Sequence, residues 1–128
     1  MTAATFGDVR SSAICAFHDA DLGRDAHGGD TPTAAAAGAW SWIEVNHRCN
    51  RLLWAQEDLA RRRDVPDAAI AANKRAIDGH NQRRNDAIER IDEALLERLA
   101  AVVPDAGAWH NSETAGSIVD RLSILALK

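Results

Sequence analysis

Tyrosine is absent from this chain of 128 residues, phenylalanine occurs only twice, and β-branched residues never form a run. These residue types are enriched in β-strands, so their scarcity argues against a sheet. Alanine, leucine, aspartate and arginine dominate the sequence instead. The composition therefore favours an all-helical protein, and a chain of this length has room for a single hydrophobic core.

An excess of positive charge is also missing, because the formal net charge is −4 and the pI is about 5.7. Nucleic-acid-binding surfaces are normally basic, so we expect no nucleic-acid partner. The sequence has no apolar run of membrane-spanning length and no basic-then-apolar leader at its N-terminus. We therefore expect a cytoplasmic protein without a membrane partner.

The familiar catalytic and metal-binding motifs are missing as well. The sequence contains no H-x-x-x-H or C-x-x-C pair, no glycine-rich phosphate loop and no nucleophile elbow, so no resident cofactor is predicted. Cys15 and Cys49 share no metal-like spacing, and we expect reduced thiols that pack as small apolar side chains. His18, His27 and His110 lie away from the other polar groups and are expected to be isolated.

Apolar residues at helical spacing predict four helices. The first lies within residues 2–20, the second spans 33–63, the third spans 66–102, and the fourth follows an N-cap at Thr114. Thr31-Pro32-Thr33 supplies a cap for the second helix, and Pro66 separates the second helix from the third. We predict an all-α, up-and-down bundle of about four helices, built on an antiparallel hairpin of the two long ones.

The whole chain, residues 1–128, is expected to form one helical domain. Residues 1–38 are expected to be a variable N-terminal helix and loop, and residues 39–128 to be the core. The chain stops at Lys128 within an apolar pattern that includes Ile118, Leu122 and Leu125. Such an ending has two explanations, a C-terminal truncation or an apolar face that a second copy covers. We expect a homo-oligomer.

Polar residues interrupt the apolar stripe of the third helix between His80 and Asp92. If the hairpin turns near Val65, residues whose numbers add to about 130 lie opposite each other. The Asn81–Asn85 segment then faces the Asn46–Asn50 segment of the second helix. An unpartnered buried polar group costs about 1–3 kcal/mol and an unpaired charge costs more, so these residues need partners.

This expected polar centre has two interpretations, and the sequence leaves both open. Asparagine, histidine and arginine side chains can form a structural network that fixes the register of the helices. Alternatively, they line a pocket for a ligand or a metal. Arg84 requires a carboxylate in either case, and the nearby possibilities are Asp86, Glu113 and Asp120. The candidate ligand-binding residues are His47, Asn50, Asn81, Arg84, Asn85 and Asp120.

Acidic residues at one-turn intervals indicate a different possible function. Glu57 lies on the second predicted helix, and Glu89 and Asp92 lie on the third. Paired carboxylates on facing helices can hold Mg²⁺ against a phosphate group, as in the all-α nucleotide pyrophosphohydrolases. The alternative function is therefore a Mg²⁺-dependent hydrolase of a nucleotide or another phosphorylated small molecule, and Mg²⁺ is expected only under this alternative. Surface ion pairs explain the same spacing without a metal.

Several blocks of the sequence are similar to a known family. They are Asn46-His47, Leu53-Trp54, Glu57-Asp58, Lys74-Arg75-Ala76-Ile77-Asp78, Asn81-Gln82-x-Arg84-Asn85-Asp86-x-Ile88-Glu89-x-Ile91-Asp92, and Asn111-Ser112-Glu113-Thr114-x-Gly116-Ser117-Ile118-Val119-Asp120-Arg121-Leu122-Ser123-Ile124. Over about residues 40–128 the chain resembles the bacterial domain-of-unknown-function family 4254. The resemblance implies a cytoplasmic, helical bacterial protein and supplies no catalytic residues. Ala115 departs from the proline that the resemblance leads us to expect after Thr114.

A non-enzymatic binding or assembly module with a buried polar centre is the function that these observations favour.

Overall fold

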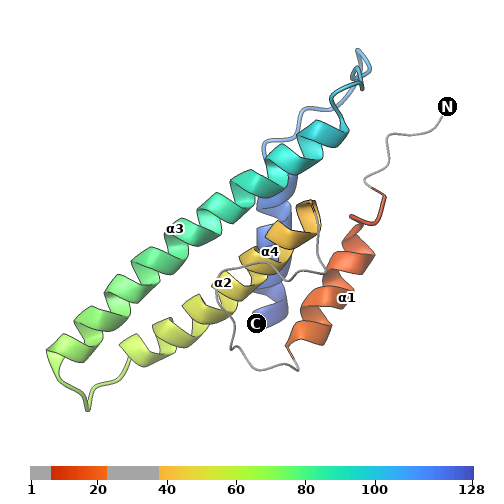
Figure 1. Cartoon of the computed structure of the whole chain (residues 1–128). Helices are drawn as coiled ribbons and strands as arrows, with labels where there is room; N and C mark the ends of the chain where they lie inside the picture. Colours follow the sequence, from red (N-terminus) through yellow and green to blue (C-terminus); the bar gives the residue numbers. More distant parts are fainter. Residues whose placement is uncertain (1–6, 23–37) are drawn as a thin grey trace.

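The computed structural model describes residues 7–22 and 38–128, which form four helices (Figure 1). They are α1 (Ser11–Asp21), α2 (Ala39–Ala60), α3 (Asp67–Arg98) and α4 (Ala115–Leu127). No strand occurs within those two ranges. The predicted all-α bundle of four helices is therefore confirmed.

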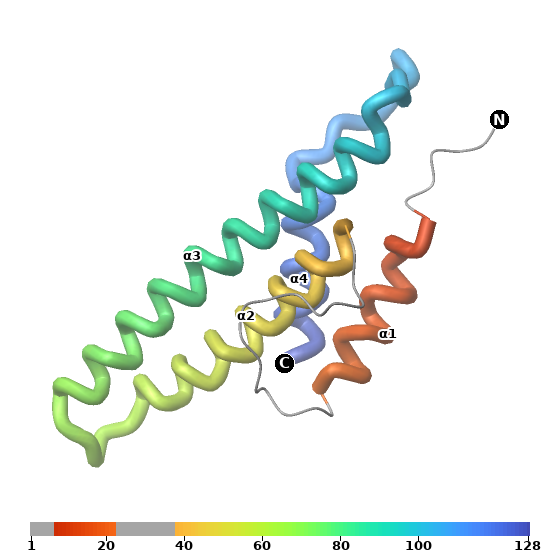
Figure 2. Tube along the Cα trace, viewed as in Figure 1, coloured from red at the N-terminus to blue at the C-terminus, as the bar shows by residue number. Residues whose placement is uncertain are grey.

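The antiparallel hairpin of α2 and α3 is the framework of the fold, because these two helices share the most extensive contact. Asn73 Nδ2 on α3 donates to Gln56 Oε1 on α2 at 2.8 Å, which agrees with the register expected from a turn near Val65. α4 packs against both helices of the hairpin, and α1 packs against α4. The end of the hairpin that carries the turn extends beyond α1 and α4 (Figures 1 and 2).

Several helix ends differ from the sequence prediction. The first helix begins only at Ser11, because Gly7 adopts a left-handed conformation with φ of 56° and residues 7–10, within the expected range of 2–20, are not helical. The third helix ends at Arg98, and Val102 and Val103 beyond it are 46% and 86% exposed. Helices gain most of their stability from packing, so an apolar stretch without a packing partner does not extend one. The predicted cap at residues 31–33 lies outside the described residues.

The hydrophobic core sits where all four helices meet. Its largest side chains are Ile43 of α2 and Ile91 of α3, which are fully buried. Burial of one such side chain stabilises the folded state by about 1.5–3 kcal/mol. A smaller cluster of Val45, Cys49 and Ala87 continues the core between the hairpin helices. Cys49 and Cys15 are free thiols, as expected.

The start of α4 is held against α3 by backbone contacts. Thr114 is the N-cap as predicted, and its side chain accepts from the backbone N–H of Ser117 at 3.1 Å. The backbone N–H of Gly116 donates to Asp92 Oδ1 at 2.7 Å. A Cβ at Gly116 would lie 2.5 Å from the carbonyl oxygen of Ile88, so only glycine allows the two helices to approach this closely.

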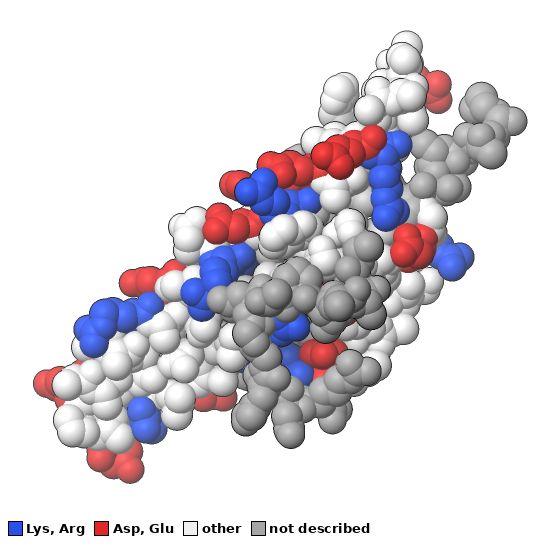
Figure 3. Space-filling view, in the orientation of Figure 1, with Lys and Arg blue, Asp and Glu red and all other residues white. Residues whose placement is uncertain are grey.

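The charged side chains of the molecule do not gather by sign on the face that Figure 3 shows, where acidic and basic groups alternate along α3. Within residues 7–22 and 38–128, none of the helices has the length and apolar character needed to cross a bilayer.

Candidate functional site

A carboxylate on α4 is the centre of a polar network between α4 and the hairpin. Asp120 Oδ1 accepts from Asn46 Nδ2 at 2.9 Å and from Asn50 Nδ2 at 3.0 Å. The guanidinium of Arg84 approaches the same oxygen from α3, with Nε at 3.9 Å. That distance is an ion-pair contact and is too long for a hydrogen bond. Of the carboxylates considered for Arg84, Asp120 is thus the one that lies beside it.

The other carboxylates considered for Arg84 have different partners. Glu113 pairs with Arg121 close to the start of α4, and Asp86 accepts from Gln82 on the exposed side of α3 at 3.0 Å.

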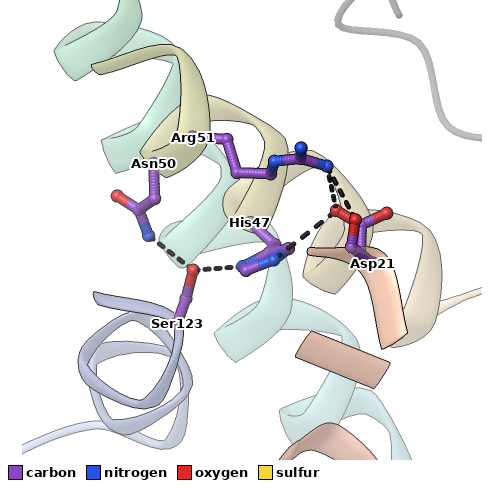
Figure 4. A network of polar contacts seen from close by, with 5 residues as sticks. All are labelled: Asp21, His47, Asn50, Arg51 and Ser123. Carbon is purple, nitrogen blue, oxygen red and sulfur yellow. Dashed lines mark hydrogen bonds and ion pairs between the residues drawn. The ribbon is translucent and has the colours of Figure 1, made fainter. Parts of the chain in front are cut away.

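The network continues through Ser123 to a buried histidine (Figure 4). Ser123 Oγ accepts from Asn50 Nδ2 at 3.0 Å and lies 2.6 Å from His47 Nδ1. With one lone pair of Ser123 occupied in this way, its hydroxyl can donate to Nδ1 of a neutral His47. The proton of His47 then resides on Nε2, which faces Asp21 Oδ2 of α1 at 3.5 Å. Asp21 is anchored by Arg51, whose Nη1 donates to Oδ2 at 3.0 Å.

His47 also stacks on a second buried histidine. The rings of His18 and His47 are 4.4 Å apart between centroids at an interplanar angle of 27°, and both side chains are fully buried. Burial lowers the pKa of His47 to about 4, with smaller contributions in the same direction from His18 and Arg51 and an opposing one from Asp21. Burial likewise lowers the pKa of His18. Both rings are therefore neutral at pH 7.

A pocket of about 240 Å³ adjoins this network and opens to solvent between α2, α3 and the end of α4. Asn50, Asn81 and Arg84 are its polar and basic lining residues next to the network. Arg84 Nε is buried and makes no hydrogen bond within the part of the chain that the structure describes. The remaining lining residues are mostly apolar or acidic: Leu53, Trp54, Glu57, Asp58, Arg61, Ile124 and Leu127.

The six candidate ligand-binding residues divide between the network and the pocket. His47 and Asp120 belong to the network, Asn81 lines the pocket, and Asn50 and Arg84 take part in both. Asn85 lies in neither, because its side chain is exposed on α3. Successive helix residues differ by about 100° in direction, so Asn85 cannot share the face of its neighbour Arg84.

Some residues of the site did not emerge as candidates in the sequence. Asn46 faces the segment of Arg84 in the predicted hairpin, and the structure gives it a direct bond to Asp120. His18 was expected to be isolated, and that expectation is wrong. His18 lies four residues after the buried Ile14, so it continues the apolar stripe of α1 and reaches His47. The four-residue spacing from Ile14 to His18 could have indicated, from the sequence alone, that His18 faces the core. His27 lies outside the described residues.

The three carboxylates considered for Mg²⁺ do not converge. Glu57 lies at the level of Asn73, because the neighbouring Gln56 bonds to Asn73. Glu89 is about four turns further along α3, or about 24 Å at 1.5 Å per residue. Asp92 bonds to the backbone of Gly116 instead. Among the described residues, no group of three or more histidine, cysteine, aspartate or glutamate side chains could hold a metal ion.

The fold and the site together define an all-α protein in which a buried network of amides, imidazoles and a carboxylate adjoins a small pocket. The family model described as "Protein of unknown function (DUF4254)" matches residues 40–128, and the chain belongs to this family. The matched segment contains every pocket residue and Asp120, whereas α1 with His18 and Asp21 lies outside it. Comparison with curated proteins and with solved structures gives no match.

Proposed function

We propose that this protein is a non-enzymatic binding module whose pocket between α2, α3 and α4 holds a small molecule with an anionic group and an apolar body. The observation that carries the proposal is the state of Arg84, a cation that lines the pocket and whose Nε is buried and makes no hydrogen bond among the described residues.

The chemistry of Arg84 supports an anionic group in the ligand. A guanidinium offers five N–H donors in a rigid plane, and it binds carboxylates and phosphates through two parallel hydrogen bonds. Asp120 attracts this cation but lies 3.9 Å from Nε, and its Oδ1 already accepts from two amides. The side-chain amide of Asn81 on the same wall can donate to a second oxygen of the ligand.

The other walls support an apolar body of limited size. Four apolar side chains line the pocket along with Glu57, Asp58 and Arg61: Leu53, Trp54, Ile124 and Leu127. The pocket volume is about 240 Å³, while a buried cavity of about 150 Å³ accommodates benzene. The pocket therefore suits a ring or a short chain that carries one carboxylate or phosphate. Phenylacetate and phenyl phosphate are representative of this class.

The position of His47 supports binding rather than acid–base catalysis. The ring is buried in the network and is absent from the pocket wall, with one nitrogen facing Ser123 and the other facing Asp21. A general acid or base must come within hydrogen-bond reach of the reacting group. A molecule in the pocket would not meet this imidazole.

Calorimetric titration and thermal unfolding with phenylacetate, phenyl phosphate and the neutral analogue benzyl alcohol test the proposal. A ligand that prefers the folded state adds about 2.7 kcal/mol of stability at a concentration of 100 times its Kd. We expect at least one of the two anions to bind and raise the Tm, and the neutral alcohol to do neither. Arg84→Met should abolish this binding.

Arg75→Met is the matched control, because Arg75 is exposed on the same helix and does not line the pocket. It should bind the anion like the unaltered protein. Trp54→Ala should weaken binding without unfolding the protein, since this side chain is 44% exposed. Equal binding of the anion to the Arg84 and Arg75 variants, or binding of neither anion to the unaltered protein, would refute the proposal.

A further inference from the structure

The far end of the molecule, away from the pocket, has an apolar hollow of about 220 Å³ where α3 ends and α4 begins. Leu95, Leu96 and Leu99 of the α3 end line it together with Asp92, Thr114 and Ala115. Its wall is almost entirely apolar, and Leu96 remains 66% exposed. An apolar hollow of this kind gains stability when an apolar group excludes water from it.

A tryptophan projects from the loop that borders this hollow. Trp109, in the loop between α3 and α4, is 98% exposed. Tryptophan buries more area than almost any other side chain, so this exposure leaves a large apolar surface in water. Trp109 lies five residues before Thr114 of the hollow, a separation of at most about 18 Å along the chain. Trp109 and the hollow are therefore close enough to fall within one protein interface, and together they are called the patch.

We infer that this patch is a homodimer interface in which Trp109 of each protomer enters the hollow of its partner. A two-fold contact requires one surface to carry both complementary parts, and this patch carries a projecting ring and an empty hollow. The hollow is larger than the cavity of about 150 Å³ that holds benzene, so its volume is sufficient for an indole ring. Leu96, which lines the hollow, is 66% exposed, so the contact would cover apolar surface that is now in water.

The same features favour a second copy of this chain over another occupant. A foreign partner would have to supply both a ring for the hollow and a cavity for Trp109. Another copy supplies both at once, because it presents the same patch. Large aromatic side chains seated in a partner pocket are the groups that dominate binding energy at protein interfaces. The interface shares no residue with the ligand pocket, so a test of the homodimer does not depend on whether the pocket binds an anion.

Sedimentation and light scattering over micromolar to submillimolar concentrations test the inference. We expect a concentration-dependent particle of twice 13.8 kDa. Trp109→Ser and Leu96→Lys should each weaken dimerisation by more than about tenfold. Both side chains are largely exposed, so neither change should unfold the protein. Leu125→Ser is the matched control, because Leu125 is also exposed, at 55%, but lies on α4 away from this patch.

Mixing the two variants distinguishes the insertion of Trp109 into the partner's hollow from nonspecific association of apolar surfaces. A Trp109→Ser protomer keeps its hollow, and a Leu96→Lys protomer keeps its ring. Each variant alone has no intact contact, whereas the mixed pair has one, so mixing should restore part of the dimer. A monomer at every concentration, a dimer unaffected by Trp109→Ser, a dimer abolished by Leu125→Ser, or no recovery on mixing would each overturn the inference.

Discussion

Acidification should destabilise this protein through the buried histidine pair. His47 is fully buried, and its pKa is lowered from 6.5 to about 4, chiefly because burial disfavours the charged ring. His18 stacked on it and Arg51 beside it disfavour the charge further, and Asp21 only partly offsets them. The folded state therefore holds His47 neutral at pH values where the unfolded chain protonates it.

The sign and size of the effect follow from this difference in pKa. Between about pH 6.5 and pH 4 the unfolded chain binds more protons than the folded one, so the free energy of unfolding falls as the pH falls. The stability is fully present above the unfolded pKa, and it is lost progressively down to the folded pKa. A difference of about 2.5 pKa units corresponds to about 3 kcal/mol. His18, whose pKa is also lowered, adds a loss of the same sign.

Urea unfolding followed by circular dichroism at several pH values measures this loss. His47→Gln replaces the titrating ring with a neutral amide that can still bond to Ser123. Both proteins lose stability between about pH 7 and pH 4. The loss in the free energy of unfolding should be about 3 kcal/mol smaller for the His47 variant than for the unaltered protein. His110→Gln is the control, because His110 is exposed in the loop before α4. The free energy of unfolding of this variant should depend on pH as that of the unaltered protein does. Parallel pH curves for the His47 variant and the unaltered protein would show that the reasoning is wrong.

Two further predictions concern the contacts that hold α4 in place. Gly116→Ala should destabilise the protein by about 1–3 kcal/mol, because the new Cβ meets a backbone carbonyl of α3. Gly79→Ala, in the interior of α3, should stabilise by about 0.5–1 kcal/mol, because its Cβ would make only an ordinary contact with the Arg83 side chain at 3.6 Å. Equal effects of the two changes in urea unfolding would contradict the close packing at Gly116. Asp120→Ala should cost about 3 kcal/mol or more, since two amides lose a charged acceptor. The exposed Asp86→Ala should change the free energy of unfolding by less than about 0.5 kcal/mol, and an Asp120 variant as stable as this control would refute the role assigned to the network.

The hairpin and the start of α4 could be predicted from the sequence because each depends on local chemistry. Proline cannot continue a helix, so Pro66 fixed where the turn had to lie. The turn position then set which residues of α2 and α3 face each other, and the bond between Gln56 and Asn73 agrees with that register. Thr114 was recognisable as a cap because its hydroxyl accepts the N–H of Ser117, three residues on.

The division of the polar centre into a network and a pocket could not be predicted in the same way. The register of the hairpin determines which residues of α2 and α3 face each other, but it does not determine where α1 and α4 pack. α4 brings Asp120 and Ser123 to the hairpin, and it is positioned by the close approach of Gly116 to α3, which no periodicity reveals. Facing helices also do not bring all their polar groups together. Glu57 on α2 and Glu89 on α3 remain far apart along the hairpin, and the side chain of Asn85 is exposed.

The structural network and the pocket, which the sequence presents as alternatives, depend on each other in the structure. Asn46 and Asn50 both donate to Asp120 Oδ1, and this fixes the carboxylate between α2 and α4. The fixed carboxylate holds Arg84 by charge at 3.9 Å without a hydrogen bond to its Nε. An arginine positioned in this way has lost rotamer freedom before a ligand arrives, so binding an anion costs less entropy. Under the proposed function, the network prepares Arg84 for an anionic ligand. A change that loosens Asp120 should then weaken binding of the anionic probe and lower the stability of the fold.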